Sequence, residues 1–116
     1  MGEALNKELA MLLKKTEEND RIIASLFQER KLNQTKTPMK IQINYFYKCL
    51  YLLNSQKNER HNVIRLSLLP IAPKNVEERV AFIEAKPGHY YSYKQLSQLF
   101  TELNDLMEQE RPDGRV

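Results

Sequence analysis

At 116 residues, the chain is long enough for one domain, and its 41% hydrophobic and 28% charged residues are typical of a globular protein. Its single cysteine, Cys49, excludes an internal disulfide, and no run approaches the roughly 20 apolar residues of a membrane span. The start also lacks the basic and apolar blocks of a secretory signal, so we expect an intracellular protein, cytoplasmic or nuclear, with no membrane partner.

The net charge of +3 is unevenly distributed. Residues 1–31 are neutral, and residues 75–116 carry five Lys or Arg against eight Asp or Glu. Residues 32–74 carry seven Lys or Arg against Glu59 alone, a net charge of +6. The central segment is therefore the part that would attract a polyanion or an acidic protein surface.

Residues 1–31 predict an N-terminal helix, because good helix formers dominate after Gly2. Apolar residues recur with the spacing of a coiled-coil seam, interrupted by Thr16 and Asn19. One interpretation is a homodimeric coiled coil or partner-binding helix, with Asn19 fixing the register. The alternatives are an amphipathic helix that packs on its own domain, or two helices broken near Thr16. The predicted interface residues are Leu5, Leu9, Leu12, Asn19, Ile23 and Leu26.

The most apolar segment, residues 39–53, predicts a central strand, because β-branched and aromatic residues alternate with polar ones. A helix over residues 39–55 is the alternative, since Ile41, Tyr45 and Leu52 also fit helical spacing. Residues 32–38 precede it as a polar connector, and Pro38 makes a helix through this point unfavourable.

Two further strands complete the predicted sheet. Residues 61–71 alternate again after a charged loop at residues 54–60, which indicates a hairpin, and Pro70 and Pro73 end its second strand. Residues 75–85 are ambiguous: Asn75 and Glu78 have capping-box spacing, but Phe82 interrupts the apolar helical face, which favours a third strand.

The clearest element is a C-terminal helix over residues 92–110, where apolar residues recur every three or four positions. We expect this helix to cover one face of the sheet. The predicted fold class is therefore α+β, with a small antiparallel meander in a compact domain over residues 38–116.

The sequence lacks the residue patterns of an enzyme. His61, His89 and Cys49 have no metal-ligand spacing, and three isolated glycines cannot form a phosphate-binding loop. The carboxylates fall mostly on the predicted helices, where charge is usually solvated. We therefore expect no catalytic residue, no cofactor and no metal.

Two functional hypotheses follow. The first is a non-enzymatic interaction or assembly module that associates through its N-terminal helix. The second is a small nucleic-acid-binding protein that uses the central segment, since basic and aromatic side chains on a sheet face can neutralise phosphates and stack on bases. Its predicted contacts are Lys40, Phe46, Lys48, Arg60 and Arg65.

Overall fold

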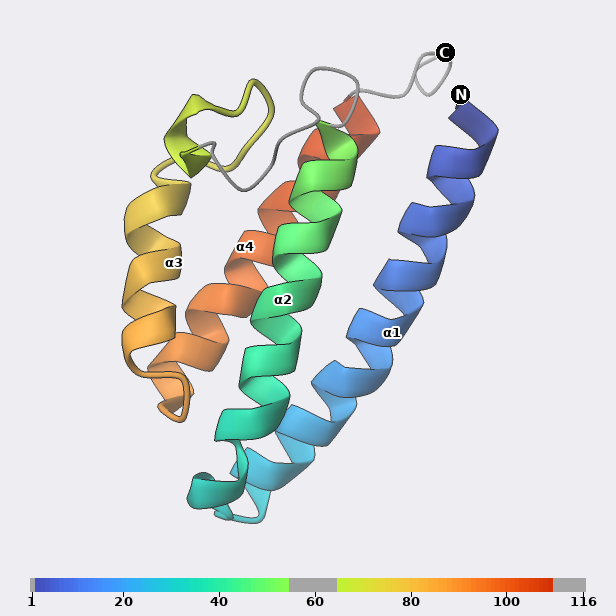
Figure 1. Ribbon diagram of the computed structural model, residues 1–116. Coiled ribbons are helices and arrows are strands. Elements are labelled where there is room, and N and C mark those ends of the chain that lie inside the picture. The colour runs from blue at the N-terminus through green and yellow to red at the C-terminus, as the bar shows by residue number, and fades with distance from the viewer. Residues whose placement is uncertain (1, 55–64, 110–116) are drawn as a thin grey trace.

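The computed structural model describes residues 2–54 and 65–109, and the side chains from residue 7 onward. These ranges fold into four α-helices, α1 (Gly2–Gln28), α2 (Lys36–Leu53), α3 (Val76–Ala85) and α4 (Tyr90–Gln109) (Figure 1). In the described parts of the connections there are two single turns of 3₁₀ helix, η1 (Leu32–Gln34) and η4 (Leu66–Leu68). No strand occurs within the described ranges, so the predicted α+β fold with a β-meander is wrong.

Helix α2 lies at the centre of the molecule and packs against all three other helices. In Figure 1, α1 runs along one side of α2, α3 lies on the other side, and α4 passes behind. Helix α1 packs mainly on α2, whereas α4 packs on both α2 and α3. None of the helices in the described ranges is long and apolar enough to cross a membrane.

Helix α2 replaces the predicted central strand. Its buried residues recur at helical spacing, which is the spacing of a face that packs on neighbouring helices; they are Met39, Gln42, Ile43, Phe46, Cys49 and Leu50. Pro38 does not prevent the helix, because it occupies the first turn, where the backbone N–H that proline lacks has no partner within the helix.

Asn54 ends α2 and ties it to the following connection. Its amide nitrogen donates to the carbonyl oxygens of Leu50 and Ile71, both at 2.8 Å, and its Oδ1 accepts from the Ile71 N–H at 2.9 Å. Residues 65–71 are η4 and irregular backbone instead of the predicted second strand, and residues 61–64 lie outside the described ranges. Leu66 and Leu69 of this connection are buried in the core. The apolar residues that suggested a strand therefore reflect contacts with the core.

Helix α3 replaces the predicted third strand. Val76, Val80 and Ile83 are buried on one face, while Phe82 is 41% exposed and packs edge-on against Tyr91, with ring centroids 5.6 Å apart. Phe82 therefore lies outside the buried face without breaking the helix. Asn75 precedes α3 in a left-handed conformation, with φ of 56°, and its side chain makes no capping bond.

The two terminal helices are confirmed. Helix α1 ends three residues earlier than predicted. Arg30, just after the helix, has a left-handed conformation with φ of 60°. The Lys31 N–H donates to the Leu26 carbonyl, and the Arg30 N–H donates to the Phe27 carbonyl. These two bonds form a Schellman motif. Helix α4 buries Leu96, Leu99 and Leu103 against α2 and α3, where a sheet was predicted.

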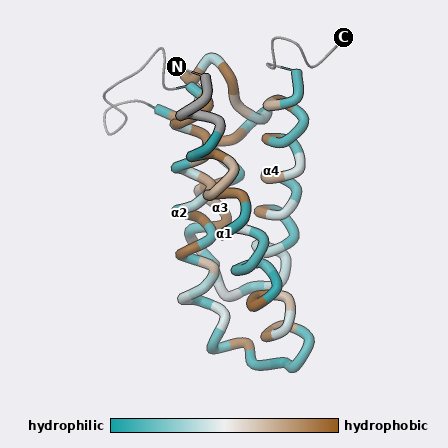
Figure 2. Tube along the Cα trace, turned by 90° about the vertical axis from the view of Figure 1, so that its right-hand side faces the viewer, coloured by the Kyte–Doolittle hydropathy of each residue, from teal (hydrophilic) through white to brown (hydrophobic). Residues whose placement is uncertain are grey.

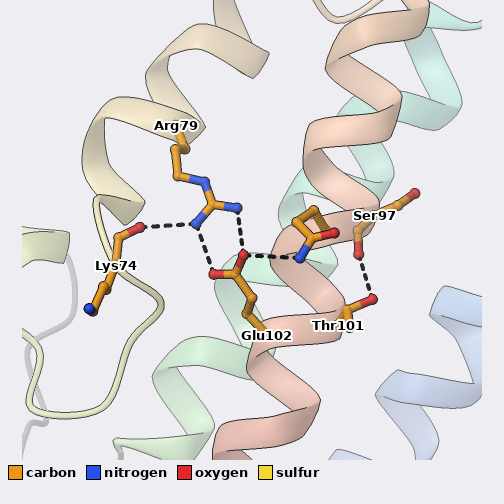
Figure 3. Close-up of polar contacts among 6 residues, drawn as sticks. Lys74, Arg79, Ser97, Thr101 and Glu102 are labelled. Atoms are coloured by element: carbon orange, nitrogen blue, oxygen red, sulfur yellow. Dashed lines mark hydrogen bonds and ion pairs between the residues drawn. The ribbon is translucent and has the colours of Figure 1, made fainter.

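An ion pair joins α3 to α4 (Figure 3). The two guanidinium nitrogens of Arg79 donate to the two carboxylate oxygens of Glu102 at 2.8 and 2.9 Å. The same guanidinium donates to the Lys74 carbonyl at 3.0 Å, and the Gln98 amide donates to Glu102 at 3.3 Å. This cluster fixes the start of α3 against the middle of α4.

Candidate functional site: a groove between α1 and α4

A groove of about 400 Å³ runs between α1 and α4, on the face where both helices pack against α2. Figure 2 gives a side view of the bundle in which α1 and α4 follow separate paths. Leu13 of α1 and Leu96 and Phe100 of α4 supply apolar walls. Gln42 of α2 lies at the floor, and Glu17, Asp20, Arg21 and Asn104 add polar groups along the walls and rim.

Gln42, at the floor of the groove, belongs to a network of buried amides. Asn19 Nδ2 donates to Gln42 Oε1 at 2.7 Å and to the Pro38 carbonyl at 2.9 Å. Gln42 Nε2 in turn donates to the Thr16 carbonyl at 3.1 Å. Because buried amides are costly to leave unpaired, this network fixes how α1 is aligned on α2.

One polar atom of the groove is left unsatisfied. Thr16 is only 7% exposed, and its hydroxyl makes no hydrogen bond with any described residue. An unpaired buried hydroxyl costs about 1–3 kcal/mol, and a bound group that pairs with it would recover part of that cost. Thr16 also lines the groove, but its hydroxyl oxygen is buried, so a ligand would have to shift the surrounding side chains to pair with it.

The rim beside α4 carries a tyrosine–carboxylate pair. The Tyr93 hydroxyl donates to Asp20 Oδ1 at 2.8 Å and so bridges α4 to α1. Burial, followed by the bond to Asp20, raises the pKa of Tyr93 to about 12. The ring of Tyr93 stacks on Phe27 with centroids 5.4 Å apart. Tyr93 is therefore a neutral hydrogen-bond donor that closes one end of the groove.

Metal-ligating clusters and the cysteine are two further features of the described residues that bear on chemistry. No cluster of His, Cys, Asp or Glu within them could hold a metal ion. Burial raises the pKa of the Cys49 thiol to about 11, so this cysteine stays protonated near neutral pH. The groove offers shape, apolar walls and hydrogen-bonding groups, which are the features of a binding surface.

The structure places most of the predicted interface residues within the chain's own packing. Ile23 is fully buried and Asn19 belongs to the amide network. Leu9 and Leu12 are half-buried and pack against the core, Leu26 is half-buried, and the side chain of Leu5 lies outside the described part. Self-association through these six residues stays a prediction.

The structure corrects one of the predicted nucleic-acid contacts, Phe46, and leaves the rest of the set a prediction. Phe46 is fully buried, so no base can stack on it; the strand assignment had turned this side chain outward. Arg65 forms a bidentate ion pair with Glu77, at 2.9 and 3.1 Å. Lys40 and Lys48 are exposed on α2, and Arg60 lies outside the described residues.

A second depression, of about 340 Å³, gathers basic groups that the sequence did not bring together. Lys36 and Lys40 of α2 face Lys86 and His89 of the α3–α4 turn. Glu84 is the acidic residue there, and it accepts a hydrogen bond from the Tyr47 hydroxyl at 2.9 Å. We call these four basic residues the basic hollow.

Sequence reasoning identified Thr16 and Asn19 as polar interruptions in the apolar seam but missed Gln42. The signal that could have found Gln42 is that Asn19, a polar residue on the apolar face of one helix, needs a polar partner on the helix that covers it, because buried polar groups are almost always hydrogen-bonded. Reading residues 39–53 as a strand placed Gln42 on a solvent face and hid this partner. The helix that forms the α4 wall was predicted correctly, but the sequence did not predict that it would line a groove.

The YpoC-like protein family has a sequence model that matches residues 6–111 of the chain. In comparisons of the chain with curated proteins and with solved structures, no match was found.

Proposed function

Since the chain belongs to the YpoC-like protein family, whose description states no activity, we propose its function from the geometry of the groove. The protein is a non-enzymatic interaction module that binds an amphipathic helix of a partner protein between α1 and α4. Docking of a helix into an apolar groove is a common mode of peptide recognition.

The observation that carries the proposal is the unpaired hydroxyl of Thr16 beside apolar walls. Leu96 and Phe100 lie four residues apart on α4 and face Leu13 across the groove, as expected for contacts with apolar positions on a third helix. A helix laid there would complete a bundle around α1, α2 and α4. Its apolar residues would cover the walls and one polar side chain would pair with Thr16.

The rim charges restrict the partner further. Glu17 and Asp20 lie on the α1 side with Arg21, and Asp20 already accepts a bond from Tyr93. Glu17 is exposed and forms no ion pair with another described residue. A Lys or Arg beside the apolar stripe of the partner helix would therefore match this rim.

Site-specific photo-crosslinking in the cells that make the protein tests this function. A benzophenone amino acid at Glu17, on the rim, should give one defined crosslinked product. The same group at Gln98, which is exposed on the α3 side of α4, should give none. Asn104→Trp should remove the Glu17 product by filling the groove without disturbing the core, because Asn104 is exposed.

Three results would contradict the proposal. They are the absence of any product from Glu17, equal products from Glu17 and Gln98, or a Glu17 product that persists in Asn104→Trp. Thermal unfolding of Asn104→Trp provides the folding control, and we expect it to match the parent protein.

The basic hollow supports nucleic-acid binding as the second candidate. Its three lysines have no ion-pair partner among the described residues, so their charges are free to contact phosphates. This function predicts that affinity for a single-stranded oligonucleotide falls steeply with salt and is lost in Lys40→Glu with Lys86→Glu. Lys7→Glu with Lys14→Glu, the same charge change on exposed α1 positions, is the matched control. Equal loss in both pairs would reject the hollow as the contact surface.

A further inference from the structure

The outer side of α1 carries a second surface, which points away from the groove. Met11, Lys15, Glu18 and Ile22 follow one another at intervals of four, three and four residues, so they form one stripe along the helix. Met11 is 62% exposed and Ile22 is 54% exposed. We call these four residues the outer stripe.

No described part of the chain covers the outer stripe. Helix α1 forms one edge of the molecule, with α2 on its inner side (Figure 1). Lys15 and Glu18 are three residues apart, yet they form no ion pair with each other or with another described residue. Two apolar side chains and two unpaired opposite charges are therefore presented together.

The order of these side chains is self-complementary. Along α1 the stripe reads apolar, positive, negative, apolar. If a second α1 runs in the opposite direction about a twofold axis near residues 16 and 17, Met11 meets Ile22 of the other copy. Lys15 then meets Glu18 of the other copy, and the same two contacts repeat across the axis. A parallel pair would instead place Lys15 against Lys15 and Glu18 against Glu18.

We propose that two copies of this protein associate through their outer stripes, with the α1 helices antiparallel. This interaction goes beyond the proposed groove function, because it uses the opposite side of α1. Only four apolar side chains meet in the interface, so its area falls below the roughly 1,200 Å² of a stable complex. The dimer is therefore a weak one that forms as concentration rises.

Charge reversal provides the sharpest test, measured by sedimentation equilibrium. The average mass of the parent chain should rise from 13.7 kDa toward twice that value with increasing concentration. Lys15→Glu alone and Glu18→Lys alone should each weaken association at least tenfold, because each places like charges together. An equimolar mixture of these two variants should associate again, since every contact between them joins opposite charges.

Cysteine pairing tests the antiparallel direction. Met11→Cys mixed with Ile22→Cys should form a disulfide between the two variants under mild oxidation. Met11→Cys by itself should form no intermolecular disulfide, because its two copies would lie about 16 Å apart along the helix. The native Cys49 is buried and does not compete.

A constant mass of 13.7 kDa up to millimolar concentration would overturn the proposal, as would unchanged association in both charge variants. A self-disulfide of Met11→Cys would overturn the antiparallel arrangement. Circular dichroism should show unchanged helicity, because all four positions are exposed. Failure of the dimer proposal would leave the proposed groove function untouched. Crosslinking from Glu17 in an Ile22→Glu variant, which cannot form the dimer, tests the groove function separately.

Discussion

The two helix pairs of this molecule are joined by different chemistry. Among the described side chains of α1, Ile23 is the fully buried aliphatic residue, and the buried amides of Asn19 and Gln42 and several half-buried apolar side chains complete the contact with α2. Helices α3 and α4 bury a continuous aliphatic contact that includes Ile83 and Leu99, with an ion pair at its edge. Polar bonds thus fix the alignment of α1, while apolar burial supplies most of the α3–α4 adhesion. Helix α1 can then leave part of its side toward α4 open as the groove, while Tyr93 bridges to Asp20 at one end.

The largest loss of stability is expected from substitutions that create a cavity of the same size in each helix pair, one in α1–α2 and one in α3–α4. Ile23→Ala and Ile83→Ala each remove a fully buried side chain, and each should lower the free energy of unfolding by about 2–5 kcal/mol. Ile83→Ala should cost more, because α3 is held between α2, α4 and η4, whereas α1 can shift toward α2. Urea denaturation measures both values. A larger loss from Ile23→Ala would reverse the comparison.

Removing the amide network should produce the next largest effect. Gln42→Leu takes away the acceptor of Asn19 and the donor to Thr16, and should cost about 1–3 kcal/mol. Asn19→Leu combined with Gln42→Leu should cost less than the sum of the single changes, because neither amide is then left unpaired. A double-mutant cycle by urea denaturation measures this coupling, and strict additivity would contradict it.

The ion pair of α3 and α4 should contribute less and should depend on pH and salt. Glu102→Gln should cost about 0.5–1 kcal/mol at neutral pH, and less in 1 M salt. The bond from Arg79, followed by that from Gln98, lowers the pKa of Glu102 below its ordinary value of 4.5. Its stabilising effect is therefore present above that ordinary value and is lost as pH falls through the lowered pKa.

Thermal unfolding at a series of pH values checks this dependence. The parent protein should lose more stability than Glu102→Gln between neutral and acidic pH. Gln42→Leu should follow the parent curve with a constant offset, because amides do not titrate. Parallel curves for the parent and Glu102→Gln would show that the ion pair contributes no stability.

The smallest effect is expected at the ion pair of Arg65 and Glu77. The Arg65 side chain is 73% exposed, so water and salt screen the pair despite its short bonds. Arg65→Ala should leave the unfolding midpoint unchanged within error in urea titrations. A clear loss would show that the 65–75 connection holds α3 in place through this contact as well as through Leu66 and Leu69.

The same difference explains what the sequence could predict. Helices α1 and α4 each pack one face on their neighbours, so most of their apolar residues recur at helical spacing on that face, with Met11 and Ile22 of α1 as exposed exceptions. Helix α2 contacts three helices, so apolar residues occupy much of its circumference and resemble strand alternation. Its helical period was nevertheless present in Met39, Gln42, Ile43 and Phe46.

The groove could be predicted only in part. The polar positions Thr16 and Asn19 stood out in the seam, but their partner Gln42 required the correct assignment of α2. Phe46 shows the cost of that error most directly, since a predicted surface aromatic is part of the core. The basic hollow joins Lys36 and Lys86, whose proximity follows from tertiary packing alone.

The short connections within the α1–α2 pair and within the α3–α4 pair favour early contacts inside each pair. Helix α1 packs on the next helix along the chain, and so does α3, so most contacts join segments that are close in sequence. Proteins with such a low contact order fold within microseconds to milliseconds. We therefore expect the α1–α2 and α3–α4 contacts to form before the contacts between the two pairs, because they close the shortest loops.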